Sequence, residues 1–236
     1  MITIRKSEER GHANHGWLNT YHTFSFASYY DPKHMGFRAL RVINDDRVAP
    51  STGFGAHAHR DMEIITYILD GHLTHRDSTG EHHTFGQHTI QTMSAGSGIV
   101  HSEFNESPKE PVHLLQIWIE PSVEDVKPAY QQIEYEPAEA HGKLRLLASP
   151  EPTEKTGAAQ IYQDARVYAS VIGSGESIEQ PVAPNRYAWV HVARGNLNLN
   201  GQELKTGDGA AISEESKLAL KGTGPNGAEI LFFDLP

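Results

Sequence analysis

Short apolar runs separated by turn residues dominate the chain. Runs rich in Val, Ile, Thr and aromatic residues recur between Gly and Pro, for example at Ile64–Leu69, Leu114–Ile119 and Glu229–Asp234. This spacing predicts an all-β protein made of sandwiches or barrels, because short strands bounded by turns assemble into sheets. Apolar patterns with a 3.6-residue period are short, and the best helical candidates are residues 124–130 and a segment near Asp164. We therefore expect few helices, all of them short.

The chain divides into two halves with a similar plan. A charged connecting segment contains five prolines, at Pro121, Pro128, Pro137, Pro150 and Pro152. On either side of it a strand, a turn glycine and a second strand follow one another, around Gly71 and around Gly195, and Asn200-Gly201 is a strong hairpin signal. The pattern favours an internal duplication, although hairpins in any β-protein share it. We expect an N-terminal barrel at residues 1–125, and a linker with a second barrel at 126–236.

Composition excludes several classes of function. The net charge of the 236 residues is −10, and Lys and Arg are scattered, so we expect no direct nucleic-acid binding. The chain has no apolar run of membrane-spanning length, and its first ten residues carry charges where a signal peptide would be apolar. A cytoplasmic protein with no membrane association is therefore expected. Cysteine is absent, so a metal site would have to use nitrogen and oxygen ligands.

Histidine is concentrated in the first half of the chain. Of 15 histidines, 13 lie at or before His113, and only His141 and His191 follow. We therefore expect the chemistry in the N-terminal barrel. The C-terminal half cannot rebuild a three-histidine site, and we expect a structural barrel without metal there.

Two pairs of residues have the spacing of metal ligands on strands. His57 and His59 are two residues apart, so their side chains share one face of an extended strand. His101 and Glu103 form a second such pair, and the glycines before them suit a tight turn. On neighbouring strands the two pairs could supply three imidazoles and one carboxylate to a divalent ion, with positions left open for water, O₂ or substrate. Glu63 is an alternative carboxylate if the strand from His57 runs unbroken.

Four segments resemble the pirin family of the cupin superfamily: His22–Phe26, Leu40–Asp46, His57–Glu63 and Ala95–Glu103. They span most of the first 120 residues. The resemblance implies a bicupin with two jelly-roll-like β-barrels stacked face to face and one divalent metal in the N-terminal barrel. It implies His57, His59, His101 and Glu103 as the metal ligands, with Glu103 rather than Glu63 as the carboxylate. The sequence departs from the general cupin pattern in having Gly96 where proline is common.

The resemblance also implies a function. Some bacterial pirin-like proteins resemble quercetin 2,3-dioxygenases, which cleave a flavonol with O₂ and release carbon monoxide. We expect a monomeric protein that acts on a small aromatic substrate. The expected metal is Fe(II), and Mn, Co, Ni, Cu or Zn would also suit the ligands. Glu103 would be both a ligand and the catalytic base. Two alternatives stay open: a redox-sensitive transcriptional co-regulator that acts through a protein partner, and a metal cupin with isomerase or hydrolase activity.

Other candidate residues receive structural interpretations. We expect the five histidines beside a turn-rich segment to be mostly solvent-facing: His72, His75, His82, His83 and His88. We expect four apolar side chains to serve as core packing rather than as a substrate cage: Phe24, Phe26, Met93 and Trp118.

Overall fold

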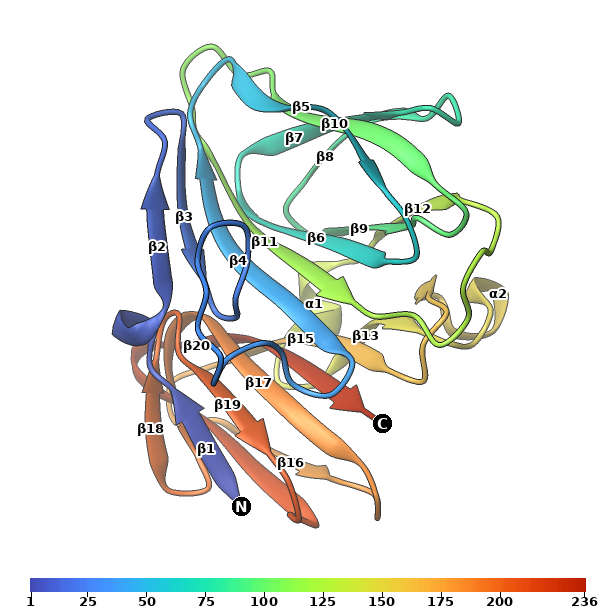
Figure 1. The fold of residues 1–236 in the computed structure, drawn as a ribbon. Helices are drawn as coiled ribbons and strands as arrows, with labels where there is room; N and C mark the ends of the chain where they lie inside the picture. Colours follow the sequence, from blue (N-terminus) through green and yellow to red (C-terminus); the bar gives the residue numbers. More distant parts are fainter. The chain divides into compact units, whose positions relative to one another are not determined.

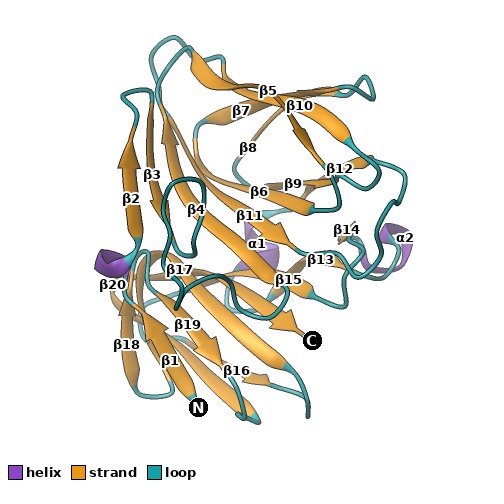
Figure 2. Ribbon diagram, viewed as in Figure 1, coloured by secondary structure: helices purple, strands orange, loops and turns teal.

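The computed structural model describes residues 1–236 and is almost entirely β (Figure 2). It contains 20 strands, a 3₁₀ turn η1 (Ser7–Glu9) and two four-residue helices, α1 (Pro137–Ala140) and α2 (Thr153–Thr156). The prediction of an all-β protein with few short helices is confirmed. No helix has the length and apolar character that a membrane crossing requires.

Both helical candidates from the sequence are wrong. Residues 124–128 form a loop, and the next six residues form strand β12 (Ala129–Glu134), which pairs with a neighbouring strand. Pro128 disfavours a helical conformation at the residue before it, which helps to explain the loop. Asp164 also lies in a loop, where Arg186 donates hydrogen bonds to its carboxylate at 2.8 Å and to its carbonyl at 3.0 Å.

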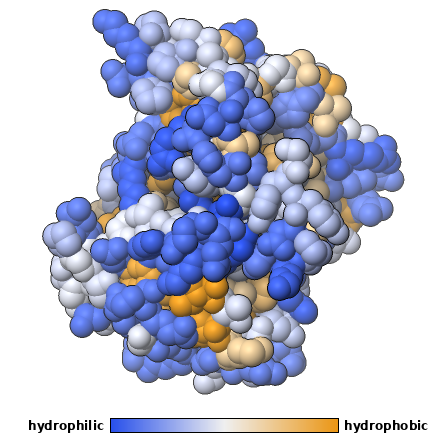
Figure 3. Space-filling view, turned by 60° about the vertical axis from the view of Figure 1, so that its left-hand side comes forward, coloured by the Kyte–Doolittle hydropathy of each residue, from blue (hydrophilic) through white to orange (hydrophobic).

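The chain forms two compact units. One comprises residues 11–134 and 159–163, and the other comprises residues 1–10, 135–158 and 164–236. The face drawn in Figure 3 is mainly hydrophilic, and hydrophobic residues gather in smaller areas between the polar ones. We call the two units the histidine-rich unit and the C-terminal unit.

The histidine-rich unit consists of two antiparallel sheets (Figure 1). The seven-stranded sheet has the order β12, β9 (Thr89–Ser94), β6 (Glu63–Asp70), β11 (Val112–Ile119), β4 (Leu40–Val48), β3 (Leu18–His22), β2 (Gly11–Asn14). The four-stranded sheet has the order β5 (Thr52–His59), β10 (Ile99–Asn105), β7 (His72–Asp77), β8 (His82–Gly86). The segment 159–163 includes β14 (Ala159–Gln160), and Gln160 exchanges two hydrogen bonds with Gln131 of β12.

Two apolar clusters fill parts of this unit. One cluster comprises Leu18, Val48, Ile68, Leu73, Phe85, Val112 and Leu114. The second comprises Ile64, Met93, Ala95 and Ile99, with Trp118 packed against them. On β6, Thr66 lies between Ile64 and Ile68 on the same strand face, because alternate residues of a strand share a face. Polar side chains therefore occupy the interior between the two clusters.

The C-terminal unit has its own sheet and core. Its strands follow the path β1 (Ile2–Arg5), β19 (Gly209–Ile212), β17 (Tyr187–Leu199), β20 (Lys217–Leu235), β15 (Arg166–Ile172), β13 (Arg145–Ser149). In addition, β16 (Ser177–Pro181) pairs with β20, and β18 (Gln202–Lys205) pairs with β17. Residues 1–10 thus supply β1 to this unit, where Ile2 pairs with Ile212. Asn200 and Gly201 both have positive φ, as the expected hairpin requires.

Candidate metal centre

Strand β10 alternates between buried and exposed side chains, as its sequence predicts. His101 and Glu103 are buried, whereas Val100 and Phe104 are exposed by 45% and 41%. The strand lies between β5 and β7 in the four-stranded sheet, so His101 and Glu103 each pair with one residue of β5 and one residue of β7. These three strands build the site.

A bulge in β5 brings further side chains onto the inner face. His101 pairs with His57, but Glu103 pairs with Phe54, so three steps along β5 match two steps along β10. Residues three apart on a regular strand point to opposite faces. The extra residue of a bulge changes this, so that two such side chains can point to the same face. The bulge therefore allows Phe54 and His57 to line the same cavity.

Three imidazoles converge at this position. The coordinating nitrogens of His57, His59 and His101 all lie within 4.8 Å of one another, and the ring centroids are 4.4 to 4.9 Å apart. The Nε2 atoms of His57 and His101 are 3.1 Å apart. Two neighbouring ligands span roughly 3 Å when each binds one cation at about 2.1 Å. The cluster thus fits a divalent transition metal.

The protonation of the rings also suits metal binding. The Nδ1 atom of His57 donates to the carbonyl of Gly55 at 2.8 Å, and a carbonyl can only accept. The Nε2 atom of His57 therefore presents a lone pair to the cluster. Burial and the neighbouring His57 lower the pKa of His101 to about 3 and that of His59 to about 4. Both rings are neutral at pH 7, as metal ligands must be.

Behind His101 lies a buried pair of residues, His75 and Asp77. The Nε2 atom of His75 donates to Asp77 Oδ2 at 2.9 Å, and both side chains are 0% exposed. Burial lowers the pKa of His75, so this ring too is neutral at pH 7. Its other nitrogen, Nδ1, is then an acceptor and lies 3.5 Å from His101 Nδ1. Such a contact directs the His101 proton away from the cluster and leaves the Nε2 lone pair free.

His75 is therefore the exception to the expectation that the histidines of this segment mostly face solvent. The other four histidines of that segment, His72, His82, His83 and His88, are exposed as expected. Sequence reasoning missed a usable signal, because His75 and Asp77 form a third pair with the i, i+2 spacing of His57 and His59. His101 pairs with Asp77 across the sheet, which brings this third pair to the same face.

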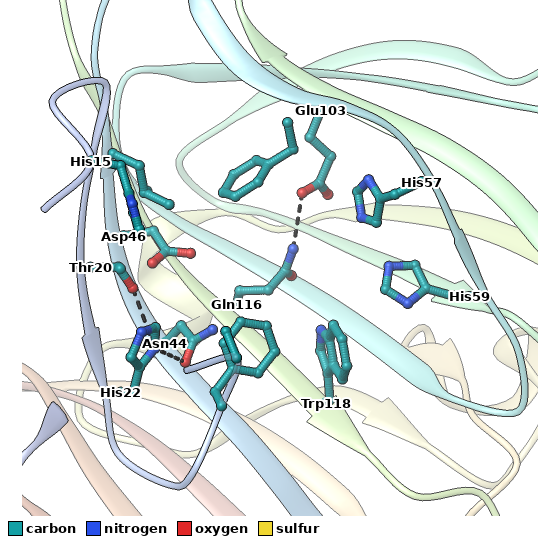
Figure 4. Close-up of a pocket in the computed structure, with 14 residues that line it drawn as sticks. His15, Thr20, His22, Asn44, Asp46, His57, His59, Glu103, Gln116 and Trp118 are labelled. Carbon is teal, nitrogen blue, oxygen red and sulfur yellow. Dashed lines mark hydrogen bonds between the residues drawn. The ribbon is translucent and has the colours of Figure 1, made fainter. Parts of the chain in front are cut away.

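Glu103 lies beside the imidazole cluster. Its Oε2 accepts a hydrogen bond from Gln116 Nε2 at 3.0 Å, and Thr66 Oγ1 donates to Gln116 Oε1 at 3.0 Å. A carboxylate oxygen of Glu103 lies within 4.8 Å of nitrogens of His75 and His101. Burial and the nearby Asp46 raise the pKa of Glu103 to about 7. The carboxylate borders the same cavity as His57 and His59 (Figure 4).

The structure does not bring Glu63 to the imidazoles. Strand β5 ends at His59 and β6 begins at Glu63, so the strand does not run unbroken. Glu63 is three residues from Thr66 and points to the opposite face of β6, where its carboxylate accepts a hydrogen bond from Ser94 Oγ at 2.7 Å. Burial raises the pKa of Glu63 to about 7. Its position argues for a structural role.

A cavity of about 180 Å³ opens beside the cluster (Figure 4). Its polar lining includes His15, Thr20, His22, Asn44, Asp46 and Gln116. Phe26, Phe54 and Trp118 supply aromatic walls, and the Trp118 ring lies 5.0 Å from His59 and 5.3 Å from Phe26. Phe26 and Trp118 therefore border the cavity, and Trp118 also packs against the cluster of Ile64 and Met93, as expected of a core residue. Phe24 and Met93 are buried core residues, as expected.

Comparison with known proteins agrees with this geometry. The pirin family model matches residues 3–119, and the model of the quercetinase C-terminal cupin domain matches residues 146–235. The chain is 44% identical to quercetin 2,3-dioxygenase of Escherichia coli (strain K12), an alignment that covers 100% of this chain and 99% of that protein. It is 40% identical to a pirin-like protein of Caulobacter vibrioides, with 99% of each covered.

A solved structure shows the same fold at comparable similarity. The bacterial pirin YhhW from Escherichia coli in complex with nickel(II) superimposes with a TM-score of 0.92 and 44% identity, over 100% of this chain and 99% of that one. Identity of this level over the full length, together with the family matches to both halves, establishes the relationship. The chain therefore belongs to the pirin family and carries two cupin domains.

Proposed function

We propose that this protein is a metal-dependent dioxygenase that cleaves a flavonol such as quercetin with O₂. The observation that carries the proposal is the cluster of three imidazoles, His57, His59 and His101, with the buried Glu103 carboxylate near His101, at the wall of an aromatic-lined cavity. The names of its relatives support the same reaction class. A dioxygenase of this kind needs a metal site beside a space for a flat substrate, and the imidazole cluster beside the cavity supports the proposal.

His57, His59, His101 and Glu103 would hold the metal. Fe(II) is the metal we propose, and the ligand set also suits Mn, Co, Ni, Cu and Zn. A similar protein binds nickel(II), which supports a site of broad tolerance. A divalent ion bound there supplies a Lewis acid that lowers the pKa of the flavonol 3-hydroxyl group.

The protein's own residues orient the substrate and accept its proton. Trp118, Phe26 and Phe54 provide apolar surfaces against which a flat ring system can lie. Glu103 would accept the proton of the 3-hydroxyl group at Oε1, because Gln116 donates to Oε2 at 3.0 Å, whereas the donor at Oε1, Thr66 Oγ1, is 3.5 Å away. Thr66 fixes the Gln116 amide, and this keeps the carboxylate turned toward the cavity.

Oxygen uptake with quercetin, coupled to measurement of carbon monoxide, tests the proposal. The protein is reconstituted separately with Fe, Mn, Co, Ni, Cu and Zn, and His101→Ala serves as the control. We expect equal amounts of O₂ consumed and carbon monoxide released with at least one metal, and none with the variant. Lack of turnover with every metal would contradict the dioxygenase and favour the co-regulator. Conversion of quercetin without O₂ uptake would favour the isomerase or hydrolase.

A further inference from the structure

Asp46 reaches the cavity from the sheet that faces the imidazoles. It lies on β4 in the seven-stranded sheet, whereas His57 and His59 lie on β5 in the four-stranded sheet. Figure 4 shows the Asp46 carboxylate pointing into the cavity, on the side opposite the two histidines and with the Gln116 amide between them.

The neighbouring Asp45 faces the other side of the strand. Its carboxylate accepts hydrogen bonds from Arg47 Nη1 at 3.1 Å and from His113 Nε2 at 2.8 Å. The two adjacent aspartates therefore differ in environment. Asp45 has partners within the protein, and Asp46 faces an open space.

The Asp46 carboxyl group is buried, and one of its two oxygens lacks a hydrogen-bond partner. The residue is 3% exposed, and the side chain of Thr20, directly opposite on β3, forms a hydrogen bond with it. Its Oδ1 atom has no hydrogen-bond partner. A buried carboxyl oxygen without a partner is costly, and Asp is a poor strand former, so neither packing nor strand propensity accounts for this residue.

The chemistry of the cavity selects the kind of group that can satisfy Asp46. Glu103 lies close enough to Asp46 for the two carboxylates to repel each other when both are charged. An anionic ligand between them would be repelled in the same way. The walls contributed by Phe26 and Phe54 favour an aromatic ring. A neutral aromatic molecule that carries a hydroxyl group offers both the ring and a hydrogen-bond donor.

We propose that Asp46 is a specificity-determining residue whose Oδ1 atom accepts a hydrogen bond from a ring hydroxyl group of a polyhydroxylated aromatic substrate. The hydroxyl group is one other than the group bound at the metal site. This inference rests on the proposed function, because it names the feature of the flavonol that the cavity selects. A site built to bond a hydroxyl group rejects an analogue that lacks it, because the acceptor is then left buried and unpaired.

Binding of two flavonols tests the proposal without turnover. Quercetin and 3-hydroxyflavone share the 3-hydroxyl group, and only quercetin carries further hydroxyl groups. Their dissociation constants are measured without oxygen on the nickel(II)-loaded protein, by quenching of tryptophan fluorescence, for the natural protein, Asp46→Leu, Asp46→Asn and the matched control Asp45→Asn. Nickel content and thermal unfolding verify that each variant is folded and loaded.

We expect the natural protein and Asp45→Asn to bind quercetin at least about tenfold tighter than 3-hydroxyflavone. Asp46→Leu should reduce this preference to less than about threefold, mainly by weakening the binding of quercetin. The preference of Asp46→Asn should lie between those of the natural protein and Asp46→Leu. If Asp46→Leu does not fold, the preference of Asp46→Asn for quercetin over 3-hydroxyflavone tests the proposal. An unchanged preference in a loaded Asp46 variant would overturn the inference and leave the proposed function intact. Failure of the natural protein to bind quercetin would instead contradict the proposed function.

Discussion

The Nε2 atoms of His57 and His101 face each other at 3.1 Å, and each belongs to a ring whose other nitrogen has an acceptor of its own. Gly55 accepts from His57 Nδ1, and His75 accepts from His101 Nδ1. With both Nδ1 atoms donating, the two Nε2 atoms present lone pairs to one another. Such a pair is unfavourable unless a cation lies between them, so the hydrogen bonds behind the rings prepare the site for a metal.

The contact between Asp77 and His75 should control metal affinity from behind the ligands. Asp77→Asn lets the His75 ring adopt the other tautomer, so His101 would lose its acceptor. We expect the dissociation constant for nickel(II), measured by competition with a chelator, to rise by about 10- to 100-fold. Asp70→Asn is the control, because the Asp70 side chain is 61% exposed. An affinity within twofold of the natural protein would rule out this positioning role.

Substitution of Glu103 should separate catalysis from metal binding. In Glu103→Gln the three imidazoles remain, while the carboxylate that we propose as the base is lost. We expect turnover to fall more than metal content does, and the two are measured on the same preparation. If activity and bound metal decline in strict proportion, Glu103 acts only as a ligand.

Substitution of Glu63 should leave the metal in place. Glu63 bonds to Ser94 on the face of β6 opposite the site. We therefore expect Glu63→Gln to bind nickel(II) with an affinity within about threefold of the natural protein, because only the loss of a residue that hydrogen-bonds to a ligand weakens metal binding by about tenfold or more. Loss of the metal in this variant would mean that Glu63 supplies the carboxylate.

The raised pKa of Glu63 also predicts how stability depends on pH. In the folded state its pKa is about 7, above the ordinary 4.5, because burial favours the protonated form. The stability that the neutral group supports is fully present below pH 4.5 and is lost as pH rises through 7. Between pH 5 and 8 the free energy of unfolding of the metal-free natural protein should fall by roughly 1 to 3 kcal/mol more than that of Glu63→Gln. Equal slopes in urea titrations would contradict the burial effect.

Close approach of β5 to β10 should make Gly53 indispensable. A Cβ atom at Gly53 would lie 2.2 Å from the carbonyl oxygen of Glu103 and 2.6 Å from Phe104 Cα, so the two strands would have to separate. We expect Gly53→Ala to destabilise the protein by about 2 kcal/mol or more, as overpacking does, and to weaken metal binding. At Gly55 a Cβ meets nothing within 4 Å, so Gly55→Ala is the matched control. Equal unfolding midpoints for the two variants would refute the strand contact.

The sequence predicted those parts of the site that depend on strand alternation. The spacing of His101 and Glu103 indicated their shared face, because a side chain two residues along a strand returns to the same side. The bulge that aligns Phe54 with His57 could not be predicted, since it depends on pairing between β5 and β10. Asp46 could not be predicted for a similar reason, because its role arises from residues on other strands and a single sequence does not show which strands are neighbours. His75 differs, since its spacing from Asp77 was a signal that the sequence did contain.

Anomalous diffraction from crystals of the nickel(II)-loaded protein tests the central claim most directly. The account predicts one strong peak per chain, within about 2.2 Å of nitrogens of His57, His59 and His101 and of a Glu103 oxygen. A peak located elsewhere, or no peak in protein shown to be folded and exposed to excess nickel(II), would contradict it.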